Sequence, residues 1–166
     1  MPFTPFHLGP ALFFGIVFSR HLNLPAFLIA NVIVDIEPFV VLLFGLDYPL
    51  HGFFHSFLGG SLVALVLYLV MVRMYPYVIG VMDIFYVGQE MSRKKIMLSC
   101  FFGVYLHIIL DSFIYADIMP FFPFGVNPFY MLGGIGGSHI YLSCVLMLVA
   151  GICLFYYCKK RNKFKG

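Results

Sequence analysis

The stretch NVIVDIEPFV, residues 31–40, places two carboxylates, Asp35 and Glu37, in one of the most apolar regions of the chain. The runs on either side, PAFLIANVIV and FVVLLFGL, contain no charged residue. A lone carboxylate near the centre of a bilayer costs on the order of 3 kcal/mol or more. Both side chains are therefore expected to have partners from elsewhere in the chain.

The composition identifies the solvent of this protein. Of its 166 residues, 62% are hydrophobic and only 10% are charged, whereas soluble domains are usually about 45–50% apolar and about 25% charged. The chain cannot cover a globule with polar surface, so lipid must surround it. Because backbone groups in lipid have to be satisfied within helices or closed barrels, we expect an all-α, polytopic helical bundle in a cell membrane, formed as one integral-membrane domain over residues 1–166.

Apolar runs separated by polar or proline-rich stretches predict about five membrane segments. They cover residues 4–20, 25–45, 51–73, 95–116 and 138–157. In the second segment Pro38 is expected to break the helix between Asp35 and Pro38, because proline disfavours helical geometry at the preceding residue. Irregular backbone at membrane depth is tolerated where it lines a cavity or is buried in protein, so this break should face an internal polar site.

Basic residues orient these segments. Arg20, Arg73, the cluster at 93–95 and the C-terminal run CKKRNKFKG all fall on one side if five segments alternate in direction. Positive charge favours the cytoplasmic side, which predicts a cytoplasmic C-terminus. The basic C-terminal run is explained by this membrane orientation and does not require a nucleic-acid site, so no nucleic-acid partner is expected.

Ionisable residues converge on the opposite side, near the external leaflet. They are His7, Asp35, Glu37, His51, His55, His107 and Asp111. Residues four apart lie on one face of a helix, so His51 with His55 and His107 with Asp111 are each expected to share a face. All seven are candidate ligands of a divalent metal. Histidine with carboxylate suits zinc best, and manganese or iron when carboxylates are numerous.

Two readings without catalysis stay open beside this one. Intramembrane Asp, Glu and His also form metal-free ion-pair networks or proton and ion pathways. A metal saturated by protein ligands would instead be structural, as in a membrane scaffold. The pathway reading requires polar groups through the whole bilayer thickness, and none of the seven residues reaches the cytoplasmic half.

Four motifs add a resemblance over residues 1 to about 125. MPFTPFHLGPAL, NVIVDIEPF, HGFFHSFLG and GVYLHIILDSF resemble the family of small membrane-bound proteins described as metal-dependent hydrolases, which includes a LexA-regulated inner-membrane protein. The resemblance implies that the seven residues above are the family's polar positions. One departure is Gly52, where family members often have Arg, and it bears on the substrate. A weaker similarity to the helical zinc phospholipase C and P1-nuclease group points toward phosphoester chemistry.

The leading functional prediction is a membrane-embedded, metal-dependent hydrolase. A metal-activated water would attack an ester or phosphoester of a lipid or other amphiphile, and Asp35 or Glu37, whichever is not a ligand, would be the general base. The chain offers no Ser-His-Asp elbow and no catalytic Cys-His spacing, which disfavours a nucleophilic residue. The pattern does not identify the substrate, the number of metals or the oligomeric state.

Overall fold

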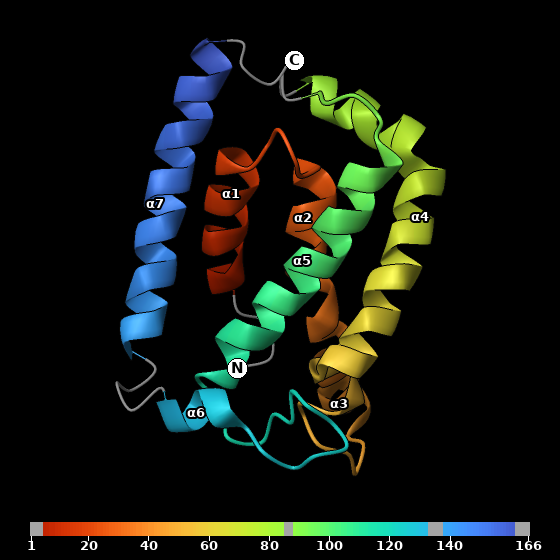
Figure 1. Ribbon diagram of the computed structural model, residues 1–166, viewed down its shortest axis with the longest axis vertical. Helices are drawn as coiled ribbons and strands as arrows, with labels where there is room; N and C mark the ends of the chain where they lie inside the picture. Colours follow the sequence, from red (N-terminus) through yellow and green to blue (C-terminus); the bar gives the residue numbers. More distant parts are fainter. Residues whose placement is uncertain (1–4, 85–87, 133–137, 162–166) are drawn as a thin grey trace.

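The computed structural model describes residues 5–84, 88–132 and 138–161, and every regular element in these ranges is helical (Figure 1). The α-helices are α1 (Leu8–Val17), α2 (Leu24–Ala30), α3 (Ile36–Phe44), α4 (Phe57–Ile84), α5 (Arg93–Ser112), α6 (Pro128–Leu132) and α7 (Ser138–Lys160). Three short 3-10 helices are η1 (Pro5–His7), η2 (Ile33–Asp35) and η3 (Phe53–His55). The all-α prediction is confirmed.

Among the described residues, four stretches are long and apolar enough to cross a membrane. They are Leu24–Phe44, Phe57–Ile84, Arg93–Ile114 and His139–Lys160. The predicted first segment is shorter, because α1 has only 10 residues and is about 15 Å long, half the hydrocarbon thickness. The predicted helix start at Thr4 lies outside the described residues. The third segment runs past its predicted end at Arg73 and includes Pro76.

Small residues allow the helices to approach closely. The helix α1 packs along α7, and α5 lies between α2 and α4 (Figure 1). A Cβ atom at Gly9 would collide with the backbone of Cys144 in α7, and one at Gly60 in α4 would lie 2.5 Å from Ile108 in α5. Lipid tails are as apolar as the helix surfaces, so burial of apolar side chains does not drive helices together in a membrane. Small residues instead let helices come close enough for extensive van der Waals contact.

The second segment is interrupted as predicted, but a few residues earlier than Asp35–Pro38. The helix α2 ends at Ala30, η2 follows over Ile33–Asp35, and α3 begins at Ile36. Glu37 is helical, contrary to the expectation that Pro38 would displace it. Proline is tolerated there because Pro38 lies in the first turn of α3, where no intrahelical donor is needed.

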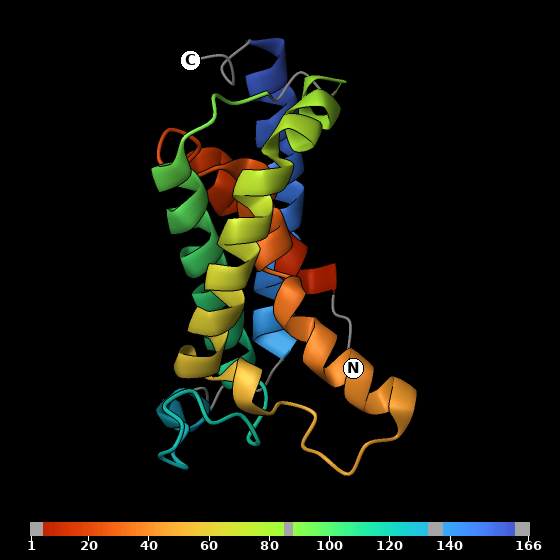
Figure 2. The same cartoon turned by 90° about the vertical axis from the view of Figure 1, so that its right-hand side faces the viewer.

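The interruption redirects the chain. In Figure 2, α3 leans away from the rest of the bundle, and it ends at Gly45, whose φ of 60° is left-handed. Side chains on α3 such as Phe39, Leu43 and Phe44 are exposed, which suits a helix that faces lipid. The turn before α3 holds Asp35 inside the bundle.

Candidate metal centre

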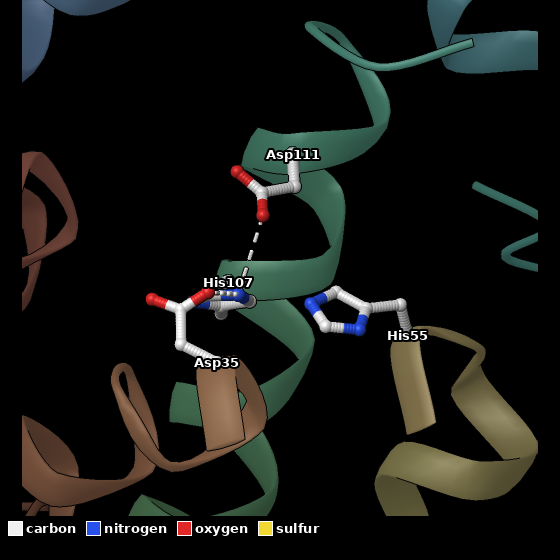
Figure 3. Close-up of side chains that lie close together, drawn as sticks. All are labelled: Asp35, His55, His107 and Asp111. Carbon is white, nitrogen blue, oxygen red and sulfur yellow. Dashed lines mark ion pairs between the residues drawn. The ribbon is translucent and has the colours of Figure 1, made fainter. Parts of the chain in front are cut away.

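Four buried side chains from three elements meet at one end of the bundle (Figure 3). Asp35 ends η2, His55 ends η3, and His107 and Asp111 lie one turn apart on α5. Each residue contributes one nitrogen or oxygen, and these atoms all lie within 4.8 Å of one another. The expectation that His107 and Asp111 share a helix face is confirmed.

His107 is held by the backbone at the break in the second segment. Its Nδ1–H donates to the carbonyl oxygen of Asn31 at 2.8 Å, which leaves the lone pair on Nε2. This Nε2 is buried and makes no hydrogen bond. It lies 3.3 Å from Asp111 Oδ2 and 3.5 Å from Asp35 Oδ1, beyond the ~2.7–2.9 Å of charge-assisted hydrogen bonds.

His55 is oriented in the same way by a carboxylate. Its Nδ1–H donates to Glu37 Oε2 at 2.8 Å, and its Nε2 is buried without a hydrogen-bond partner. Burial lowers the pKa of His55, although the hydrogen bond to Glu37 opposes this shift. A neutral imidazole with a free Nε2 lone pair is the form that binds metals.

The donor set suits a divalent cation. Two histidine nitrogens without hydrogen bonds face two carboxylates, Asp35 and Asp111, and with neutral histidines this group carries two negative charges. Buried charge without compensation is costly, and a divalent ion would neutralise it while giving both Nε2 atoms a partner. The buried Asp/His group could therefore hold a metal ion, whose identity the donors leave open.

His7 lies at the edge of this group. Its Nε2–H donates to Asp111 Oδ1 at 2.9 Å, and its ring centroid is 4.2 Å from that of His107. Its Nδ1 is buried and unpartnered. His7 therefore orients Asp111 and also contacts His107.

Glu37 lies behind His55 rather than among the four. Besides the bond to His55, its Oε1 accepts from the backbone N–H of Phe54 at 3.2 Å. Both carboxylate oxygens are therefore engaged in orienting η3. An outer carboxylate that fixes the tautomer of a metal-binding histidine is a common arrangement in metal sites.

His51 lies outside the four and does not share a helix face with His55, so that expectation is wrong. Both precede α4, which begins only at Phe57. His51 Nδ1 pairs with Asp117 Oδ2 at 2.9 Å, and its ring lies 4.9 Å from the ring of His55 and 4.4 Å from that of Tyr115. Asp117 is half exposed, so this pair reaches the protein surface.

Gly52 has a local reason to lack a side chain. A Cβ atom there would collide with the ring of Tyr48, whose hydroxyl accepts from the backbone N–H of Phe53 at 3.0 Å. Tyr48 thus occupies the space beside position 52, where the family resemblance predicts an arginine. The irregular chain around His51 is built on this contact.

Sequence reasoning missed three supporting residues. Asn31 supplies a backbone carbonyl, Tyr48 packs on Gly52, and Asp117 pairs with His51. The one available signal was Asn31, a polar residue within an apolar run just before Asp35. Every residue has a backbone carbonyl, so the residue type does not show which carbonyl will accept a hydrogen bond from a histidine.

A comparison with known families matches nearly the whole chain. The model described as YdjM inner membrane protein covers residues 5–165. No curated protein and no solved structure matches the chain. The family description agrees with the four membrane-length apolar stretches, and supports a location in the membrane. On this match, the chain belongs to the YdjM inner membrane protein family.

Proposed function

We propose that this protein is a membrane-embedded, metal-dependent hydrolase of a lipid or other amphiphile. The observation that carries the proposal is the pair of buried Nε2 atoms, on His55 and His107, that face two carboxylates without a hydrogen bond. In a site whose only role is to pair charges, each Nε2 would be expected to hydrogen-bond to a carboxylate. Zinc is the metal we favour, with manganese and iron as the alternatives.

The ligands would be Asp35, His55, His107 and Asp111, with His7 beside them. When bound, a divalent metal acts as a Lewis acid and allows water to be a nucleophile near neutral pH. The bond from Glu37 to His55 keeps the proton on Nδ1 and the lone pair on Nε2. We therefore assign Glu37 a positioning role, and not that of the general base.

Proton transfer is assigned to the His51–Asp117 pair. The Nδ1–H of His51 donates to Asp117, which leaves the lone pair on Nε2 as the proton acceptor. The ring lies against His55 on the surface side of the metal centre. After uptake of a proton at Nε2, the imidazolium would return to neutral by passing its Nδ1 proton to Asp117, which is half exposed and can release it to water.

The membrane orientation follows from charge. The C-terminal basic residues lie at the end of α7 far from the metal centre (Figure 1), and we propose that this end is cytoplasmic by the positive-inside rule. The site then lies near the external leaflet. An amphiphile in that leaflet would bring its polar linkage to the depth of the metal centre.

The test combines metal content with turnover. The protein is reconstituted in vesicles with zinc, manganese or iron, and metal content is measured beside hydrolysis of a panel of ester and phosphoester amphiphiles. We expect bound metal and turnover in the wild type and in His21→Ala, whose exposed histidine lies far from the site, and neither in His107→Ala. Tightly bound metal without turnover of any panel member would favour a structural site, and absence of metal would refute the proposal.

A further inference from the structure

Two adjoining cavities open along the lipid-facing side of α4. The first has a volume of about 430 Å³ and lies between α3 and the start of α4, and the second has about 340 Å³ and continues along α4. Ile33, Phe54 and Val63 line both cavities. The two cavities therefore adjoin, and we call them together the α3–α4 groove.

The groove ends beside the metal centre. Glu37 is the one charged residue that lines it, and this carboxylate bonds to His55. The rest of the lining is apolar apart from Tyr48. A molecule that fits the groove therefore needs a long hydrocarbon part and a polar part at the Glu37 end.

The polarity of the groove's lining changes along its length as polarity changes across a membrane leaflet. Tyr48 borders its outer end, and tyrosine is enriched where headgroups meet hydrocarbon. From there the wall follows α4 to Val70, and the eight residues from Val63 to Val70 span about 10 Å along a helix. Both walls belong to stretches of membrane-spanning length, Leu24–Phe44 and Phe57–Ile84.

The groove is too narrow for another helix. If the 340 Å³ cavity extends over about 10 Å, its cross-section is roughly 34 Å², less than half that of a helix about 10 Å across. A single hydrocarbon chain is thinner than a helix and matches the apolar lining. A further cavity of about 340 Å³ lies between α1, α5 and α7. Among the described hydrogen bonds, no side chain that lines it bonds to any of the four residues, whereas Glu37 of the groove bonds to His55.

We propose that the α3–α4 groove binds the acyl chain of a membrane glycerolipid and holds its ester or phosphoester linkage beside the metal centre. The proposal rests on the proposed hydrolase for the role of the bound lipid in turnover. Chain binding itself requires only the groove. Val63 lines both cavities, so a chain that occupies the whole groove must pass this side chain.

Photocrosslinking tests where the chain lies. The reconstituted full-length protein is irradiated with a phosphatidylglycerol probe that carries a diazirine in one acyl chain, and the adducts are mapped by mass spectrometry. We expect adducts concentrated severalfold at groove residues over other lipid-facing positions. Val63→Phe should abolish this enrichment, whereas Val149→Phe, an equal change at an exposed α7 position outside these cavities, should preserve it.

The outcomes separate this proposal from the proposed function. Groove adducts that persist in His107→Ala, together with no turnover in the wild type, would support chain binding and refute the hydrolase. Metal-dependent turnover with adducts spread evenly over all lipid-facing helices would refute chain binding alone. Labelling of the groove by a polyprenyl probe but not by the acyl probe would also overturn the proposal.

Discussion

Buried polar side chains gather at both ends of this apolar bundle, and the two groups are built differently. At one end is the candidate metal centre formed by Asp35, His55, His107 and Asp111. At the other, beside the α1–α2 connection, Gln89 is buried among Asn23, Tyr75 and Ser99, a group we call the Gln89 network. Figure 1 shows the two ends separated along the length of α5, which contributes to both.

The Gln89 network satisfies itself. The Gln89 side-chain amide donates to the carbonyl oxygens of Ser19 and Leu22 at 3.0 and 3.1 Å, and its oxygen accepts from the N–H of Leu24 at 2.8 Å. The Tyr75 hydroxyl donates to the Gln89 carbonyl at 2.6 Å. These bonds tie the connection before α5 to the start of α2.

The metal centre does not satisfy itself. Among the described residues, the buried side-chain atoms that lack a hydrogen bond are His7 Nδ1, Asn31 Oδ1, His55 Nε2 and His107 Nε2, all at this end. The Gln89 network is therefore satisfied by hydrogen bonds within the chain. In the candidate metal centre, nitrogen and oxygen acceptors face each other without a donor between them. The second group could therefore hold a metal ion, whereas the first needs no ligand to satisfy its buried polar atoms.

The largest expected effect is on metal binding when a ligand is removed. His107→Ala or Asp111→Ala should weaken metal affinity more than the about 10–100-fold that loss of an outer partner causes. The double variant should be scarcely worse than either single one, because both act through one ion. Metal content after dialysis measures this, with His21→Ala as the histidine control. Small and additive losses would mean that both ends of the bundle are structural.

A smaller effect is expected from Glu37→Gln, which keeps the size of the side chain but removes its charge. The amide oxygen can still accept from His55, but without the charge that favours the N–H on Nδ1. Metal affinity should fall by about 10-fold, at the lower end for an outer partner. A metal titration followed by competition with a chelator measures the change. Unchanged affinity would remove Glu37 from the support of the site.

At the other end, Gln89→Ala should leave metal affinity unchanged. It should lower stability by roughly 1–3 kcal/mol, because the Leu24 N–H and the carbonyl oxygens of Ser19 and Leu22 lose buried partners. The measurement is denaturant unfolding in detergent, with and without metal. The stabilisation by metal should equal that of the wild type, since distant sites behave additively. Loss of metal in this variant would show that the two ends are coupled.

Much of the fold could be predicted from the sequence. Long apolar runs gave the helical segments, and the carboxylates of DIEP required a break because they could not face lipid. The position of the break could not be derived, because Pro38 is equally compatible with the interior of a loop and with a first helical turn. The structure resolves this choice by winding residues 33–35 as a 3-10 helix before α3.

The site was predictable where spacing alone decides it. His107 and Asp111 lie four apart in a long helix, and the structure keeps them on one face. His51 and His55 have the same spacing, but no helix includes both, because η3 begins only at Phe53. Which of several polar residues would contact each other depends on tertiary packing, and neither the Glu37–His55 bond nor the His51–Asp117 pair has a local signal.

Gly103 lies one turn before His107 on α5. A Cβ atom there would lie 2.5 Å from the Ala30 side chain and 3.1 Å from the amide nitrogen of Asn31. The absence of a side chain at this position lets α5 approach the residue whose carbonyl holds His107. A methyl group at this position would move α5 away from Asn31. It would thereby change the distances between the four residues of the candidate metal centre without contacting their nitrogen or oxygen atoms. The geometry of this candidate site thus depends on a residue with no functional group, so keeping the four ionisable residues alone does not ensure that the distances between them are kept.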